Sequence, residues 1–415
     1  MAPTAQQDEE SRYAEIARSF PIVDTHNDFP YLLRVQLRNQ IHTHNPFNFN
    51  GELTSHTDLP KLRKGGVGIQ FFSCFIECKN PDYLYQDFDA ANSAVRDTLE
   101  QIDVTKRLID EYPDQMEYVT NSVEALEAFQ KHGKIAVTMG VEGLHQVDTS
   151  LGVLREYFHL GVRYITLTHN CDNPFATAAS SVIGGLPDKG LSDYGRSCVK
   201  EMNRLGMMVD LSHVSYKTMH DVLDVTKAPV LFSHSSAFSL TQHERNVRDD
   251  VLVRLKDNGG VVCVNFFPGF IAQNGSTSAT IHDAVDHIAH IIDIAGWDHV
   301  GMGSDFDGIP EGPKGLEDVS KYPDLLIELM KRTNASDEQI KKVMGGNVLR
   351  IWRQNEDIAK ELSKEIQPVE ENWKERSWKF YGYVKDFPEV YPGSNKVYEE
   401  TTEFDNEQTL FITEK

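Results

Sequence analysis

The 415-residue sequence predicts an α/β fold, and within that class a (β/α)8 TIM barrel with a C-terminal extension. Eight short runs are almost continuously apolar, as strands buried on both faces should be, and segments with a helical pattern separate them. Six of the eight runs also end in His, Asp or Glu, and functional residues gather at the carboxyl ends of barrel strands. A doubly wound open sheet is the alternative, which the strand count disfavours.

The expected strands are short, and most are bounded by glycine or by polar residues that follow them. In chain order they span 21–26, 67–75, 135–143, 162–169, 206–213, 228–234, 259–267 and 299–308. Between them, apolar residues recur with the period of a helix at 93–112, 122–133, 150–161, 193–206, 216–225, 251–260 and 280–296. Several of these segments end in Gly just before the next strand, which is the usual C-terminal signal of a helix in such a unit.

Three regions follow from this pattern. Residues 1–19 form an acidic N-terminal segment, 20–350 the catalytic barrel, and 351–415 an aromatic and acidic extension. We expect the extension to pack on the barrel or at a subunit contact. A long polar insertion at 29–57 follows the first strand, and loops of that size are usually functional.

Composition excludes several classes of partner. Sixty-three acidic against 41 basic residues give a formal charge of −22, which disfavours nucleic acids and anionic membranes. No apolar run reaches the roughly 18 residues that cross a bilayer. The beginning of the chain has no basic and apolar leader and its end has no long apolar tail, so we expect a cytoplasmic protein. Five cysteines without a zinc-type pair are expected to be buried thiols.

Residues at the expected strand ends predict a metal site. His26 and Asp28 lie two apart at the end of the first strand, so their side chains point the same way. Glu142 ends the third strand, where an isolated carboxylate would be costly to bury and a bridge between two cations would remove that cost. His213 and His234 end consecutive strands about 4.8 Å apart. Imidazole nitrogen suits zinc, so this set predicts two zinc ions that share Glu142 and activate a bridging hydroxide.

Two further strand ends carry candidates for proton transfer and charge stabilisation. Asp305 ends the eighth strand and is placed to take a proton from the activated water and return it to a leaving amine. Asp307 is the second choice for this role. His169 ends the fourth strand and could stabilise a developing oxyanion or support another ligand. The remaining histidines are interpreted as structural or solvent-facing, including His287 on an expected helix.

The phrases DTHNDFP, GVEG, LTHNCDNP, VDLSHVS, PVLFSHSSA, ERNVRDD and GSDFDG occur in this order between about residues 20 and 350. The ordered set resembles the membrane dipeptidase (renal dipeptidase) family of binuclear zinc peptidases. The resemblance implies the same ligand set, with Asp305 as proton carrier and His169 near the scissile carbonyl. It also assigns Arg245 to the carboxylate of the substrate, a role that the residue's position alone does not reveal.

The resemblance implies a homodimer, and it matches Cys78 and Cys171 to a cysteine pair that is bridged in secreted members. In a reducing cytosol we expect both to be thiols, and the alternative is a bridge that their proximity would allow after purification. The predicted function is therefore a zinc dipeptidase acting on dipeptides with a free C-terminal carboxylate, possible substrates being Cys-Gly and its S-conjugates. The alternatives are another binuclear-metal amidohydrolase, acting on a cyclic amide, a β-lactam or an N-acyl amino acid, and a metal-stabilised scaffold.

Overall fold

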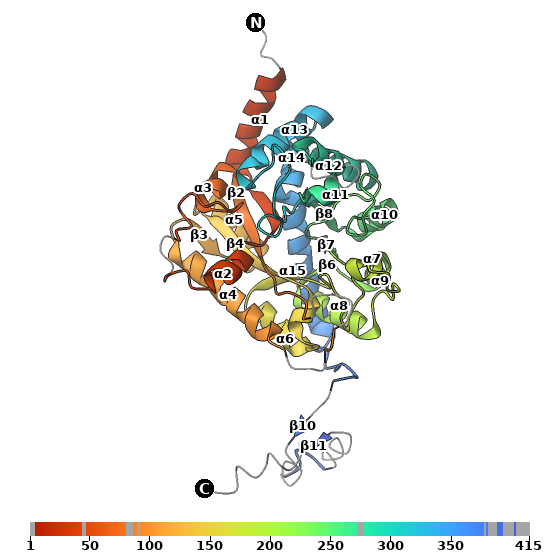
Figure 1. Ribbon diagram of the computed structural model, residues 1–415. Coiled ribbons are helices and arrows are strands. Elements are labelled where there is room, and N and C mark those ends of the chain that lie inside the picture. Colours follow the sequence, from red (N-terminus) through yellow and green to blue (C-terminus); the bar gives the residue numbers. More distant parts are fainter. Residues whose placement is uncertain are drawn as a thin grey trace.

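Eight parallel strands close into a barrel at the centre of the molecule (Figure 1). The computed structural model describes residues 5–43, 47–79, 86–88, 92–272, 278–376, 379–380, 388–392 and 402–403. The barrel strands are β1 (Ile22–Asn27), β2 (Val67–Cys74), β4 (Ile135–Glu142), β5 (Val162–Thr166), β6 (Met208–Asp210), β7 (Leu231–Phe232), β8 (Val261–Val264) and β9 (Val300–Met302). They pair in this order, and β9 returns to β1. The predicted (β/α)8 barrel is confirmed.

All seven predicted helices are present on the outside of the barrel. They are α4 (Ala94–Glu111), α5 (Ser122–Gln130), α6 (Leu151–His159), α8 (Asp193–Leu205), α9 (Tyr216–Val225), α10 (Asp249–Asn258) and α12 (Ile281–Ala295). Side-chain caps begin several of them: Asn121 accepts from two backbone N–H groups of α5, and Ser192 accepts from Gly195 of α8. Gly206 and Gly259 end α8 and α10 in the left-handed conformation that favours glycine.

The structure adds elements that the sequence pattern did not predict. The helices are α1 (Ala5–Ser19), α2 (Phe29–Leu37), α3 (Leu59–Lys64), α7 (Ala179–Ile183), α11 (Pro268–Ile271), α13 (Tyr322–Thr333), α14 (Asp337–Lys341) and α15 (Asn347–Glu365). Shorter turns are η1 (Leu144–Val147), η3 (Trp297–His299), η4 (Val319–Lys321) and the π-type η5 (Lys342–Gly346). Strand β3 (Met116–Tyr118) pairs beside the start of β4, and β10 (Lys379–Phe380) pairs with β11 (Thr402–Glu403).

Helix α15 closes the amino-terminal end of the barrel, behind the strands in Figure 1. Its Trp352 is fully buried and packs on Phe71 of β2 at a centroid distance of 5.1 Å. The same apolar cluster contains residues near the starts of other strands, including Val23 and Val261. The part of the predicted extension that lies in α15 therefore packs on the barrel, whereas its aromatic residues Trp378, Tyr381 and Tyr383 lie outside the described residues. This arrangement leaves the carboxyl ends of the strands for the functional site.

The acidic N-terminal segment also forms regular structure. Helix α1 buries Tyr13 and Ile16 and contacts α13 (Figure 1). Within the part of the chain that the structure describes, no helix is both long and apolar enough to cross a bilayer.

Candidate metal centre

His26 and Asp28 meet at the carboxyl end of β1. His26 Nε2 lies 3.2 Å from Asp28 Oδ2, and both side chains are buried. The alternation of side chains along the strand places them on one side, as expected. His26 Nε2 and Asp28 Oδ1 have no hydrogen-bond partner. Buried polar atoms without partners are costly, so these two atoms suit a bound cation.

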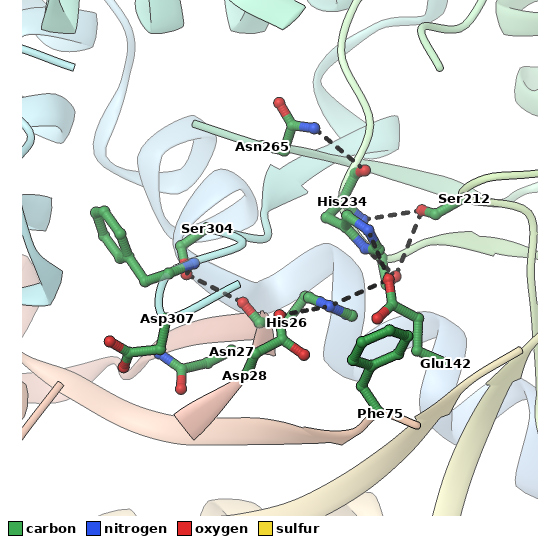
Figure 2. Close-up of polar contacts among 12 residues, drawn as sticks. His26, Asn27, Asp28, Phe75, Glu142, Ser212, His234, Asn265, Ser304 and Asp307 are labelled. Carbon is green, nitrogen blue, oxygen red and sulfur yellow. Dashed lines mark hydrogen bonds and ion pairs between the residues drawn. The ribbon is translucent and has the colours of Figure 1, made fainter. Parts of the chain in front are cut away.

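Glu142, the last residue of β4, lies at the centre of the cluster (Figure 2). Its Oε1 atom is 2.9 Å from His213 Nε2, 3.2 Å from His234 Nε2 and 3.6 Å from His26 Nε2. His213 and His234 follow β6 and β7, and their Nε2 atoms are 3.0 Å apart. His213 has a φ of 64°, in the left-handed region that only a few per cent of non-glycine residues adopt.

Hydrogen bonds from the surrounding residues fix how two of the imidazoles are protonated. The Tyr164 hydroxyl donates its hydrogen to Thr25 O, so it accepts from His26 Nδ1 at 2.9 Å. The Ser233 hydroxyl donates to Asp210 Oδ2 and therefore accepts from His234 Nδ1 at 2.8 Å. Each of these bonds places the hydrogen of the neutral ring on Nδ1 and leaves the Nε2 lone pair free.

The third imidazole, that of His213, also has its hydrogen on Nδ1. His213 Nδ1 lies 3.2 Å from Asn170 Oδ1, which also accepts from Ser180. In the neutral rings all three Nε2 lone pairs therefore converge on the Glu142 carboxylate, and this set of acceptors requires either a bound proton or a cation. A metal cation satisfies such a set, because deprotonated imidazole nitrogens and carboxylate oxygens are its ligands.

Two groups of three ligands share Glu142. His26, Asp28 and Glu142 form one, and Glu142, His213 and His234 form the other, each with ligand atoms within 4.8 Å of one another. These five residues are the set that the sequence predicted to be ligands, and the fold brings them together. Asp305 also lies within this distance of His26 and His234.

Burial and neighbouring charges shift the pKa values in the cluster. Burial lowers the pKa of His213 and of His234 well below the ordinary value, and the Arg245 charge lowers both further. Burial raises the pKa of Glu142, and the Asp28 charge adds to this although His26 opposes it. Burial by itself lowers the pKa of His26, but the charges of Asp28 and Glu142 outweigh this effect and raise the pKa to about 10. A cation would compensate these carboxylates in place of that proton.

The cluster opens into a cavity of about 470 Å³ whose wall includes the other predicted site residues: Asp305, His169 and Arg245. Asp305 has a φ of 65°, and burial raises its pKa to about 7, with His26 opposing. The His169 ring packs between Phe75 and His213, each at a centroid distance of 4.4 Å. Burial lowers the pKa of His169 well below its usual range, so the ring is neutral.

Arg245 is 3% exposed, and its Nε and Nη1 atoms have no hydrogen-bond partner. Burial lowers its pKa to about 10, which leaves the guanidinium charged at neutral pH. The guanidinium lies 5.3 Å from the centre of the Phe270 ring. A buried cation with free donors on a cavity wall suits a carboxylate ligand.

Asp307, the second choice for proton transfer, is directed elsewhere. Its Oδ1 accepts from the backbone N–H of His56 at 2.7 Å, and its carboxylate points away from His26 in Figure 2. Two other histidines lie outside the site: His145 is buried and binds Ile76 O at 2.6 Å, whereas His42 is exposed and lies 3.6 Å from Glu111 at the surface. His44 lies outside the described residues.

The prediction that Cys78 and Cys171 are thiols is wrong, because the structure joins them in a disulfide. They follow β2 and β5, whose carboxyl ends lie on the same rim of the barrel, with the two Cα atoms 6.3 Å apart. The pairing is the one that the family resemblance matched, between cysteines 93 residues apart in sequence. Cys74, Cys198 and Cys263 are buried free thiols, as predicted.

Several supporting residues were not predicted. Tyr164 lies within β5, where a tyrosine looks like an ordinary core residue, and it reaches His26 across the barrel. Asp210 accepts from Thr166, Ser233 and the backbone of Ser212, and so fixes the strand ends that carry His213 and His234. The sequence signal that could have identified Ser233 is the Ser-His pair that occurs at both strand ends, as Ser212-His213 and Ser233-His234.

A family model described as membrane dipeptidase (peptidase family M19) matches residues 10–366. The chain belongs to the membrane dipeptidase family. It is thus a peptide-bond hydrolase with dipeptidase activity that depends on metal, and the resemblance noted in its motifs is confirmed.

Relatives of this dipeptidase cover nearly its whole length. A Schizosaccharomyces pombe protein described as an uncharacterized dipeptidase is 65% identical over 403 residues, which are 97% of each chain. Another from the same organism, with the same description, is 48% identical over 345 residues, or 82% of each chain. The crystal structure of an M19 metallopeptidase called dipeptidase AC has a TM-score of 0.70 and 27% identity, covering 81% of this chain and 99% of that chain.

A metallopeptidase from Rhodobacter sphaeroides is similar to the same degree. Its structure has a TM-score of 0.69 and 26% identity, and it covers 81% of this chain and 99% of that chain. It was solved with a phosphinate mimic of the dipeptide L-Ala-D-Ala.

Proposed function

We propose that this dipeptidase uses two zinc ions to hydrolyse dipeptides with a free C-terminal carboxylate. His26 and Asp28 would hold one ion, His213 and His234 the other, and Glu142 would bridge them. The observation that carries this proposal is the convergence of three imidazole lone pairs on one carboxylate oxygen. When bound, the ions polarise the scissile carbonyl and activate the attacking water.

The residues of the cavity wall would orient the substrate and move the proton. Arg245 would bind the terminal carboxylate, since its buried guanidinium has free donors. His169, neutral and packed between Phe75 and His213, would donate a hydrogen bond to the oxygen of the scissile carbonyl as charge develops. Asp305 would accept the proton of the attacking water and pass it to the leaving amine.

We propose Cys-Gly and its S-conjugates as substrates within this class. The assay compares glycine release from L-Cys-Gly with glycinamide release from the C-terminal amide of the same peptide, using zinc-loaded protein. Hydrolysis of the acid but not of the amide supports recognition of the carboxylate. Equal rates for both would contradict the role of Arg245. No hydrolysis of either, at full metal occupancy, would exclude Cys-Gly as a substrate and favour another amide bond.

The second residue of the dipeptide is also open to a test. The Rhodobacter sphaeroides relative was solved with a mimic of a dipeptide with a D residue in this position. We therefore propose that this chain accepts both L-Ala-L-Ala and L-Ala-D-Ala. Measuring kcat/KM for both stereoisomers decides it, and a hundred-fold preference for the L isomer would contradict the proposal.

The homodimer and the cytoplasmic location stay predictions. Sedimentation velocity of the purified protein tests the first, and cell fractionation tests the second. The Cys78–Cys171 disulfide argues against the cytoplasm, because such bonds are typical of oxidising compartments.

A further inference from the structure

His287 lies on α12, outside the cavity, and connects two segments that form the cavity wall. The backbone N–H of Ala237 donates to His287 Nδ1 at 2.9 Å, and His287 Nε2 lies 3.0 Å from Ile271 O. The side chain is 1% exposed. A backbone N–H can only donate and a carbonyl can only accept, so the hydrogen of the ring is on Nε2. Burial lowers the pKa of His287 to about 4, which keeps this neutral form at neutral pH.

The first segment carries Arg245. Ala237 and Val247 form a bridge that closes the loop between them, with Val247 N donating to Ser236 O at 2.7 Å and Phe238 N to Val247 O at 2.9 Å. Arg245 lies two residues before Val247. The hydrogen bond from Ala237 to His287 therefore anchors the base of the loop that presents the guanidinium.

The second segment is α11, which carries Phe270. Ile271 follows Phe270 directly, so the bond from His287 to Ile271 O fixes this ring beneath the Arg245 guanidinium. Asn246 ties the two segments a second time, because its Nδ2 donates to Phe270 O at 2.8 Å and to Thr241 O at 2.9 Å. Thr241 Oγ1 adds a further bond between them, to Ala272 O at 3.2 Å. Together these bonds leave Arg245 and Phe270 little freedom to separate.

We propose that His287 is a positioning residue that holds the Arg245 loop against α11, so that the guanidinium faces the substrate carboxylate. The inference rests on the proposed role of Arg245 in binding that carboxylate. His287 touches neither the proposed metal ligands nor the cavity, so it acts through Arg245 and Phe270 alone. It therefore controls binding of the substrate and not the chemical step.

The test is a double-mutant cycle on zinc-loaded protein. His287→Phe removes these two hydrogen bonds and the longer contact of Nε2 with Thr241 Oγ1 at 3.4 Å, whereas His287→Gln keeps one acceptor and one donor. We expect His287→Phe to raise KM for the free-acid dipeptide on the order of ten-fold and to change kcat by less than about three-fold, because the proposed ligands and Asp305 stay in place. His287→Gln should restore most of the affinity. His290→Ala is the matched control, since His290 on the same helix pairs with Asp249 outside the cavity.

Arg245→Ala completes the cycle. In that background His287→Phe should change kcat/KM by less than about two-fold, because the group that it positions is gone. An equal loss in both backgrounds, or a loss of bound zinc, would overturn the inference and leave His287 a purely structural residue. If Arg245→Ala itself leaves KM unchanged, the proposed carboxylate role fails, and the inference fails with it. Thermal unfolding of each variant separates these outcomes from misfolding, and His287→Ala, which also removes the hydrogen bonds without adding volume, replaces His287→Phe if that variant does not fold.

Discussion

The substitution Gly308→Ala, which adds a single methyl group beside Asp28, tests the proposed metal site. A Cβ atom added at this exposed position would lie 3.0 Å from Asp28 Cγ and 2.9 Å from Asp305 Oδ1, and closer still to Asp28 Oδ2. Carbon atoms in contact prefer about 3.5–4.0 Å, so the Asp28 carboxylate would have to retreat by at least about 0.5 Å. Metal–ligand distances vary by only about 0.2 Å. The substitution Gly308→Ala should therefore weaken metal binding by roughly 10- to 100-fold.

The measurement is zinc affinity by competition with a chelating dye, together with the metal content after dialysis and kcat at saturating zinc. Gly152→Ala is the matched control, because Gly152 lies in α6 and its added Cβ would meet nothing closer than Ser150 Oγ at 3.3 Å. That control should bind zinc as the unaltered protein does. If Gly308→Ala leaves the zinc affinity unchanged, the assignment of Asp28 as a ligand is refuted, because the added methyl group displaces the Asp28 carboxylate.

Three further outcomes follow from the site. Glu142→Gln should lower the zinc content to at most one ion per chain and reduce kcat at least about a hundred-fold, because the bridging charge is lost; two ions by mass spectrometry would contradict this. Asp305→Asn should keep both ions and lose roughly 10²- to 10⁴-fold in kcat, and wild-type turnover would remove Asp305 from proton transfer. Replacing Cys78 and Cys171 by serine should lower the free energy of unfolding in urea by about 2–5 kcal/mol, because the unfolded chain is then no longer cross-linked between residues 93 apart. An unchanged midpoint and slope of the urea unfolding curve would disprove this prediction.

The barrel could be predicted because its strands are buried on both faces, which leaves an apolar signal in each run. The helices outside it were predicted where they are long and amphipathic. Helix α2 was missed because it is the first part of an insertion that is polar as a whole, although Phe29 and Leu33 are buried. Helix α1 was missed because its acidic residues conceal the two apolar side chains, Tyr13 and Ile16, that contact the core.

The five proposed ligands could be predicted because barrel geometry gathers strand ends at one rim, so proximity follows from topology alone. The residues that support them could not, because their partners are distant in sequence and their types are common in cores. Tyr164 and His26 are separated by 138 residues and meet only across the barrel interior. The left-handed backbone of His213 and Asp305 likewise depends on contacts made after folding.

Substrate binding and catalysis in this cavity both require added positive charge. Asp28, Glu142, Asp305 and Asp307 give the cavity four carboxylates, against which Arg245 supplies one positive charge. A dipeptide brings a carboxylate of its own, and its hydrolysis develops further negative charge on the scissile carbonyl. A wall of this composition would repel both, and burial makes the repulsion stronger than it would be in water. Cations held by the proposed ligands would reverse the sign of that field, so the ions that would complete the cluster would also allow the cavity to hold its substrate.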